Sequence, residues 1–335
     1  MPLRSLQLNE PTPEIGEIGA AVQRDDGGFY LLDPFVRRVL AYDRSGAIEA
    51  VQGRPGEGPG GYLSVHGLAQ DEAGRVLVTD SRKLTLTILH ADLTPDTTIR
   101  TGLMMGPLAA GPGGLVADAY GGRSGNRLQI VSPSGAVGRS FYAPPDAISE
   151  NPYWSSFAEV RLAVSGDRIV ATNGLLYPLA VYNFRGDSVG VLGSPPPSFK
   201  EIRVVRAGAF SGVSGGRALD DFLVSFTTIA GLTIIEDDYL VVTHGRMRRS
   251  VANSLSSNQE SLDVYHLPSG RKLYEDITLP LGARVLAGGR SLALLVSTPP
   301  EPWRIETFAL RTPEQRADIA LSRNEAPGPG GWARP

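Results

Sequence analysis

The chain has 335 residues, 41% of them apolar, with a net charge of -3 and no cysteine. This length is normal for one repeat-built domain, and the absence of cysteine excludes disulfides, thiolate catalysis and zinc–sulfur sites. The small net charge favours neither nucleic acid nor an anionic membrane as a partner. The 40 glycines and 26 prolines predict many turns rather than a helical protein.

The chain opens with one short apolar strand, Leu3–Leu8, and a four-stranded meander follows it. The strands of this first unit are predicted at Ile18–Gln23, Phe29–Asp33, Val36–Asp43 and Ile48–Val51. Turns rich in Asp, Gly and Ser separate these runs, as expected for antiparallel hairpins. The second unit lies within Gly53–Asp92, and its apolar runs overlay on those of the first. These runs are Gly67–Ala69, Val76–Thr79 and Leu84–Leu89.

Four further units repeat the same pattern of short apolar strands and turns. The strands predicted for the third and fourth units are Leu115–Asp118, Arg127–Val131 and Val137–Tyr142, then Phe157–Val164, Arg168–Asn173, Ala180–Phe184 and Ser188–Leu192. Those for the fifth and sixth are Thr228–Ile235, Tyr239–Thr243, Leu262–Leu267 and Lys272–Leu279, then Ala283–Ala287, Ser291–Val296 and Arg304–Leu310. The sixth unit lacks a fourth strand. We expect Leu3–Leu8 to supply it beside Arg304–Leu310 and so to protect both sheet edges.

The repeats predict an all-β fold, a six-bladed β-propeller of four-stranded antiparallel blades closed by the N-terminal strand. Residues 1–311 would form the propeller. Residues 312–335 would form a C-terminal extension, with a short helix that starts at the capping box Thr312–Gln315 and a Pro/Gly-rich tail. Long loops are expected at Ala143–Ser156, Gly193–Ser225 and Gly245–Ser261, and loops of this length are often functional.

The second unit carries a motif that resembles a known repeat family. Gly56–Gly60 and the aromatic Tyr62 precede Gly67–Asp71, Gly74–Val76 and the strand end Asp80-Ser81. This order resembles an NHL-type repeat, and the whole chain is similar to divergent bacterial six-bladed propellers of the NHL and TolB-like group. The resemblance implies the propeller fold, which hosts binders and enzymes alike.

The resemblance also implies a location in the periplasm or outside the cell, because relatives are mostly exported. The sequence adds no signal peptide to this, since Met1–Glu10 lacks the apolar stretch that such a segment needs. No apolar run reaches the roughly 18–20 residues that cross a bilayer. We therefore expect no transmembrane segment, and a cytoplasmic location stays open.

Residues at the entry of each first strand are expected to face the mouth of the central channel. His66 holds this position in the second unit, and the equivalents in the other units are Gly19, Met104, Glu159, Ala230 and Gly282. The amidating lyases that the repeat resembles need several histidines at these positions. This sequence places only one histidine there, so we expect no three-histidine metal site. If the chain is an enzyme, His66 and Glu159 are its acid/base candidates. Otherwise His66 is a solvated channel residue.

Oxygen-bearing side chains end the second strand in four successive units, at Asp33, Asp80, Asp118 and Asn173. Such oxygens suit calcium, and lactonase-type propellers bind calcium through channel carboxylates and an asparagine. Glu17 and Asn173 are the candidate ligands to test. An Asp at a strand end more often caps its own turn, and repetition favours that structural role. We expect no cofactor, with calcium as the open alternative.

Aromatic and basic side chains in the predicted loops and tail are candidates for contacting a partner. They are Tyr153, Trp154, Phe157, Arg246, Arg248, Arg249 and Trp332. The aromatic residues suit either partner anchors or a plug over the propeller's own edge. The basic cluster His244–Arg249 suits either an acidic partner or a solvated face, and no interleaved aromatic residues favour nucleic acid.

The few titratable residues at the predicted channel positions favour a binding function over catalysis. We expect a non-catalytic platform for protein–protein interaction, an accessory or stabilising subunit of a larger assembly that its long loops and tail contact. The alternative is a lactonase-like or amidating-lyase-like hydrolase or lyase that acts at the channel mouth through His66 and Glu159.

Overall fold

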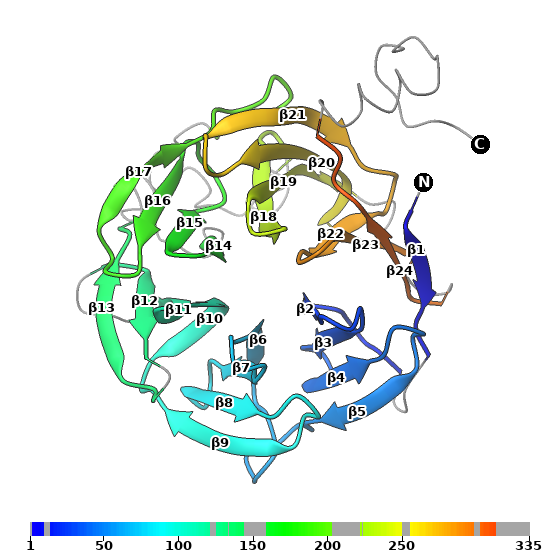
Figure 1. Ribbon diagram of the computed structural model, residues 1–335, viewed down its shortest axis with the longest axis vertical. Helices are drawn as coiled ribbons and strands as arrows, with labels where there is room; N and C mark the ends of the chain where they lie inside the picture. Colours follow the sequence, from blue (N-terminus) through cyan, green and yellow to red (C-terminus); the bar gives the residue numbers. More distant parts are fainter. Residues whose placement is uncertain are drawn as a thin grey trace, which may run out of the picture.

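The six predicted meanders form six separate four-stranded sheets. The computed structural model describes residues 2–9, 14–120, 125–132, 134–143, 159–202, 222, 224–249, 255–297 and 302–312. The sheets stand in a ring around a central axis (Figure 1), which makes the fold a six-bladed β-propeller. Within the described ranges, no helix has the length and apolar character to cross a bilayer.

The blades follow one another in chain order, each as an antiparallel meander. Blade one is β2 (Ala20–Gln23), β3 (Phe29–Asp33), β4 (Arg38–Tyr42) and β5 (Ile48–Gln52); blade two is β6 (Val65–Gln70), β7 (Val76–Asp80), β8 (Thr85–Leu89) and β9 (Pro95–Arg100). Blade three is β10 (Met104–Gly111), β11 (Gly114–Tyr120), β12 (Leu128–Val131) and β13 (Val137–Phe141); blade four is β14 (Arg161–Ser165), β15 (Arg168–Thr172), β16 (Leu179–Asn183) and β17 (Ser188–Leu192). Blade five is β18 (Thr228–Ile235), β19 (Tyr239–Arg249), β20 (Leu255–His266) and β21 (Arg271–Thr278). Blade six is β22 (Arg284–Ala287), β23 (Leu292–Ser297), β24 (Arg304–Phe308) and the N-terminal β1 (Arg4–Gln7).

The ring is closed by pairing between the two ends of the described chain, as the sequence predicts. Strand β1 pairs antiparallel with β24, with Leu6 opposite Ile305, and the two lie side by side in Figure 1. The Leu8 amide extends the ladder by donating to the Trp303 carbonyl at 2.8 Å. Blade six thereby gains its fourth strand, and the outer edge of β24 is covered.

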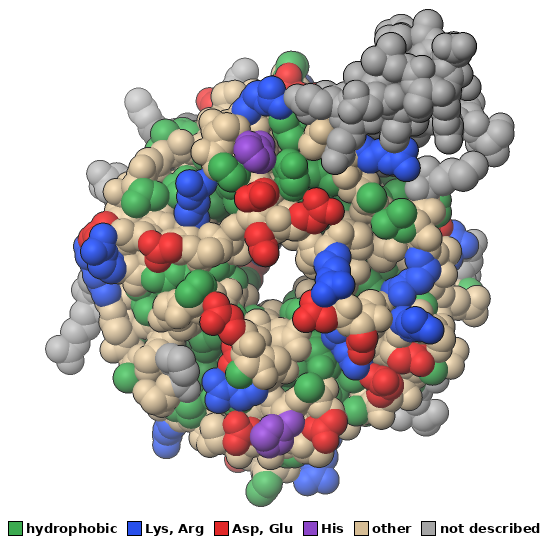
Figure 2. Space-filling view, in the orientation of Figure 1, with side chains coloured by type: hydrophobic (Ala, Val, Ile, Leu, Met, Phe, Trp, Pro, Cys, Tyr) green, Lys and Arg blue, Asp and Glu red, His purple; other side chains and the backbone are tan. Residues whose placement is uncertain are grey.

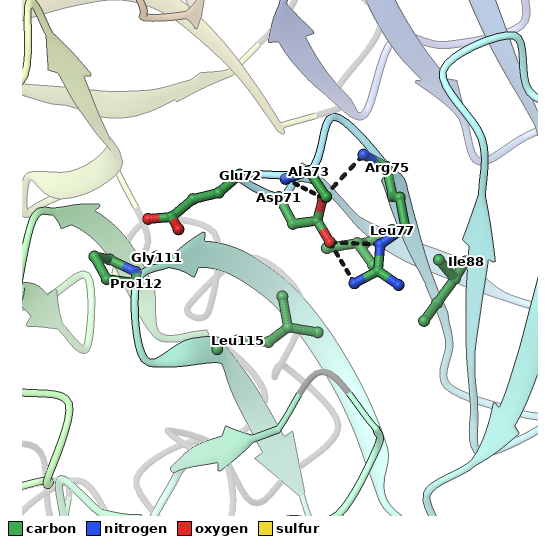
Figure 3. Close-up of a pocket in the computed structure, with 10 residues that line it drawn as sticks. Asp71, Glu72, Ala73, Arg75, Leu77, Ile88, Gly111, Pro112 and Leu115 are labelled. Carbon is green, nitrogen blue, oxygen red and sulfur yellow. Dashed lines mark hydrogen bonds and ion pairs between the residues drawn. The ribbon is translucent and has the colours of Figure 1, made fainter.

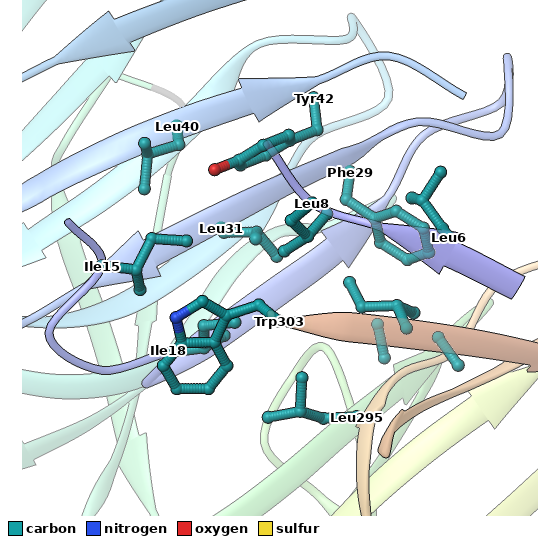
Figure 4. Close-up of a cluster of buried hydrophobic side chains, with 13 residues drawn as sticks. Leu6, Leu8, Ile15, Ile18, Phe29, Leu31, Leu40, Tyr42, Leu295 and Trp303 are labelled. Carbon is teal, nitrogen blue, oxygen red and sulfur yellow. The ribbon is translucent and has the colours of Figure 1, made fainter. Parts of the chain in front are cut away.

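The hydrophobic core consists of six clusters, each between two neighbouring blades. The cluster between blades six and one joins Leu6 and Leu8 of the opening segment to Trp303 and Phe29 (Figure 4). A sheet in this arrangement buries both faces, one against each neighbour. This explains why the inner strands β3, β4 and β7 are buried at every position instead of alternating.

Two features of the blades differ from the sequence prediction or were not foreseen. Gly245–Ser261 was expected to be a loop, and this is wrong at both of its ends, because β19 and β20 continue as a long hairpin to the pair Arg249–Leu255. Strand β9, Pro95–Arg100, was not singled out. Both segments are polar, and backbone pairing with a neighbouring strand holds them without an apolar pattern.

The predicted C-terminal extension lies outside the described residues from position 313 onward, so the boundary after residue 311 stays a prediction. Most of the expected loop Ala143–Ser156, and residues 203–221 of the loop Gly193–Ser225, also lie outside them.

The closing strand gives a test of what holds the ring together. We expect Leu8→Ala to lower the free energy of unfolding by about 2–5 kcal/mol, because it leaves a cavity between β24 and blade one. Leu3→Ala is the matched control, since Leu3 is 63% exposed, and should change stability by less than about 0.5 kcal/mol. Urea unfolding measures both. Equal effects of the two changes would contradict closure by this segment.

Candidate functional site

The innermost strands of all six blades line a cavity of about 280 Å³ on the propeller axis. Because every innermost strand runs in the same direction, all six begin at one face, which we call the mouth face. The turns between first and second strands lie at the other, which we call the turn face. The polar side chains that line the cavity are His66, Arg161, Thr233, Thr243, Glu260 and Arg284.

His66 reaches the cavity from the start of β6, as predicted. The pairing of β6 with β7 shifts between Val65 and Gly67, so His66 is the extra residue of a β-bulge, a device that re-aims a side chain. Its Nε2 lies 3.0 Å from the Ser64 hydroxyl. Gly67 allows the tight packing beneath it, because a Cβ there would lie 2.2 Å from Leu108.

Glu159, the other acid/base candidate, is held by a different neighbour. Its carboxylate accepts a hydrogen bond from the Arg161 guanidinium and forms an ion pair with it. Within the described ranges, no hydrogen bond or ion pair joins Glu159 to His66. Each candidate is thus engaged by a neighbour on its own blade, and His66 lines the cavity whereas Glu159 is not among its lining residues.

The overlay of the units places some channel residues correctly and misses others. Gly19, His66 and Ala230 line the cavity, whereas Arg161 and Arg284 take the places expected for Glu159 and Gly282. Each arginine lies two residues after the overlaid position. Because side chains alternate along a strand, residues i and i+2 share a face, and this rule could have found both.

The second-strand ends confirm the structural role expected for their repeated oxygens. Asp33 accepts the backbone N–H groups of two residues in its turn, and Asp80 and Asn173 do the same, at 2.9–3.1 Å. Asp33 and Asp80 also reach back to the chain that enters their own blade. Asp80 accepts the Leu63 N–H at 2.7 Å, and Asp33 accepts the Gly16 N–H at 3.1 Å. Asp33 and Asp80 thereby hold the chain where it enters the innermost strands of blades one and two.

Asp118 serves a different junction. It accepts two hydrogen bonds from Arg127, at 2.9 and 2.7 Å, and one from the Val160 N–H at the entry of blade four. Burial raises the pKa of Asp118, although the Arg127 guanidinium opposes the rise. Its oxygens, like those of the other strand ends, are thus already engaged by donors.

The calcium hypothesis stays a prediction. Glu17 is exposed ahead of β2, and the side-chain oxygen of Asn173 accepts two backbone N–H groups. No group of three or more His, Asp or Glu side chains placed to hold a metal ion occurs among the described residues.

Of the predicted partner-contacting residues, the structure describes the side chain of Arg246 alone. This arginine extends from β19, and its guanidinium donates to the Ser198 carbonyl at 3.0 Å and to the Thr227 hydroxyl at 3.4 Å. Arg248 and Arg249 lie on the same strand, but their side chains are not described. Tyr153, Trp154, Phe157 and Trp332 lie outside the described residues.

Blade five contains a buried polar cluster that the sequence analysis did not predict. His244 is 2% exposed, and its Nε2 lies 3.6 Å from Asp263 and 4.0 Å from Asp276. Burial alone would raise the pKa of Asp263. The contacts that this carboxylate makes with His244, the Asp276 N–H and Lys272 instead hold its pKa below the usual value. In sequence, His244 reads as part of a basic run. Only the pairing of β19 with β20 brings it close to the carboxylate.

Comparison with known proteins shows that the chain resembles several solved structures in fold. No family model matches the chain, and neither does any curated protein. A solved member of the DUF4221 family from Bacteroides vulgatus has a TM-score of 0.64 at 10% identity, covering 93% of this chain and 98% of that one. A candidate exported protein from Bacteroides fragilis has a TM-score of 0.60 at 10% identity, with 92% and 95% covered. Virginiamycin B lyase from Staphylococcus aureus has 0.52 at 12% identity, with 92% and 99% covered.

Identities this low show a shared fold and carry no activity with them. Membership in the NHL-repeat family stays a prediction from the second-unit motif.

The buried cluster predicts a pH-dependent stability. Because the pKa of Asp263 is lower in the folded chain than its unfolded value of about 3.9, its contribution is fully present above that value and is lost as the pH falls through the folded pKa. Asp263→Asn should therefore cost about 2–4 kcal/mol near pH 7. The difference from wild type should shrink in acid.

Urea unfolding at neutral pH and near pH 3 measures this difference. Asp238→Asn, an exposed change in the same blade, is the control and should have little effect at either pH. A cost of Asp263→Asn that stays constant between the two conditions would contradict an ionised Asp263 as its source.

Proposed function

We propose that this chain is a non-catalytic propeller platform that binds another protein through its mouth face, as an accessory or stabilising subunit of an assembly. The observation that carries this proposal is a set of exposed apolar side chains at that face. Phe35, Met104 and Leu281 are 76%, 49% and 77% exposed. Large apolar and aromatic side chains in such positions are typical anchors of protein interfaces.

The distribution of apolar side chains over the molecule supports this choice of face. Phe35 lies in the turn between β3 and β4, Met104 begins β10, and Leu281 precedes β22, so all three lie at the mouth face. The other large exposed apolar residues of the described ranges lie on outer strands or at the N-terminus, at Leu3, Val51, Val137, Val189 and Val191. The two longest connections between blades, from Phe141 to Arg161 and from Leu192 to Thr228, also leave from and return to this face.

The channel residues favour binding over catalysis. An acid/base pair needs both groups within hydrogen-bond reach of the protons that they transfer in one bound substrate, with protonation states suited to that transfer. His66 contacts Ser64, whereas Glu159 is neutralised by Arg161. The arginines that line the cavity are also engaged, since Arg284 donates to the Ile18 carbonyl of blade one. These contacts support the platform over a hydrolase or lyase.

The proposal includes a location in the periplasm or outside the cell, as the motif resemblance implies. The candidate exported protein from Bacteroides fragilis supports this to the extent of a shared fold. Fractionation of the producing cells tests this part, and recovery of the chain in the cytoplasm would overturn it.

Purification of the full chain from its native cells tests the platform. We expect a stoichiometric partner that is lost when Phe35, Met104 and Leu281 are changed together to serine, because each loses an apolar contact of about 1–3 kcal/mol. Deletion of residues 312–335 should weaken the complex as well. Changing Val51, Val189 and Val191 to serine is the matched control, since these are exposed on outer strands and should leave the complex intact.

Two results would overturn the platform. One is a complex that survives the triple change at the mouth face. The other is hydrolysis of lactones or cleavage of amidated peptides that His66→Ala abolishes.

A further inference from the structure

A second cavity opens between blades two and three, away from the axis. It has a volume of about 200 Å³ and lies between the turn that joins β6 to β7 and the turn that joins β10 to β11. Its floor is apolar, made by Leu77, Ile88 and Leu115 of the inter-blade core (Figure 3). Both turns belong to the turn face, so this cavity opens opposite the exposed anchors of the mouth face.

The cavity exists because one of its walls has almost no side chains. The β10–β11 turn runs Gly111-Pro112-Gly113-Gly114. From the blade-four side Phe184 packs directly against it, since a Cβ on Gly111 or Gly113 would lie 2.6 Å from the Phe184 ring or side chain. From the blade-two side no such aromatic residue is among the described lining, and the apolar floor stays open.

The rim of the cavity is polar and carries one acidic group without a partner. Asp71 is neutralised by Arg75 at 2.8 Å, and Arg75 also lies 4.0 Å from Asp96. Glu72 is exposed and extends across the opening toward Pro112 (Figure 3). Among the described residues its carboxylate makes no hydrogen bond or ion pair, so it is available to a cation at the edge of the apolar floor.

The inner turns of the turn face carry an excess of acidic residues. The first–second turns of the six blades, residues 24–28, 71–75, 112–113, 166–167, 236–238 and 288–291, hold eight acidic and three basic residues. Figure 2 shows this face, with acidic side chains gathered around the central opening. Clustered negative charges of this kind attract a peptide segment with several positive charges and speed its association.

We propose that the turn face docks a basic segment of another protein, which inserts one leucine- or phenylalanine-sized side chain between blades two and three. A neighbouring Lys or Arg of that segment pairs with Glu72, and further basic residues follow the acidic turns. The cavity is smaller than the roughly 300–1,000 Å³ of small-molecule sites, which fits a single side chain. The charge of the face selects a basic partner over an acidic or neutral one.

Fluorescence anisotropy with the full chain tests this proposal. The probe is a labelled nine-residue peptide in which Lys and Arg flank a central leucine, measured at low ionic strength because exposed ion pairs are screened by salt. We expect it to bind about fivefold or more tightly than the same peptide with a central glycine, since an apolar side chain buried in part contributes about 1 kcal/mol. A peptide with Glu in place of Lys and Arg should not bind.

Two variants separate the apolar and the charged contributions. Ala73→Trp fills the opening from an exposed rim position and should remove the advantage of leucine over glycine. Glu72→Lys should weaken both basic peptides about fivefold or more. Glu57→Lys is the matched control, an exposed change of the same charge at the mouth face, and should change binding less than twofold.

Three results would overturn the proposal. Equal binding of the leucine and glycine peptides, or no effect of Ala73→Trp, would show that the cavity takes no side chain. No effect of Glu72→Lys would remove the charged contact. Displacement of the probe by a synthetic peptide of residues 313–335, in which Trp332 lies two residues before Arg334, would make the chain's own tail the occupant instead of a partner.

Discussion

The structure depends on the packing of apolar blade faces against one another. A single four-stranded meander has two apolar faces and no way to bury both, so each blade needs a neighbour on each side. Six clusters between blades satisfy this need only if the ring is closed. Strand β1 provides the closure, because it completes blade six and places Leu6 and Leu8 in the last cluster. The positions of both cavities and both faces depend on this closed ring.

The same ring separates two faces with different chemistry. Because all innermost strands run in parallel around the axis, one face collects the strand entries and the other collects the turns between first and second strands. The entries are fixed by buried strand-end oxygens, such as those of Asp33 and Asp80, and this face also presents exposed apolar side chains. The turns are rich in Asp, which suits tight hairpins, and also contain Glu72 and Glu236. Turn chemistry thus gives the second face its negative charge.

The two proposed contacts use different faces of the ring. At the mouth face, Phe35 and Leu281 extend from short connections of the scaffold. At the turn face, the glycine-rich turn of blade three leaves an apolar floor open beside Glu72. Both sites lie on connections that a stable scaffold positions, which is where binding residues are usually found. Neither site depends on the channel groups that an enzyme would need.

The sequence was enough to predict the repeat, the number of blades, the closure of the ring and the capping role of Asp33, Asp80 and Asn173. These follow from local patterns, since apolar runs, turn residues and strand ends are neighbours in the chain. Local pattern gave no sign of the polar strand β9 or of the long β19–β20 hairpin. Which side chains meet depends on the three-dimensional arrangement of the blades. The folded arrangement brought His244 to Asp263, held Glu159 with Arg161 and opened the cavity beside Glu72. Those outcomes depend on strand register, bulges and the stacking of separate blades, and the order of residues in the chain encodes none of them directly.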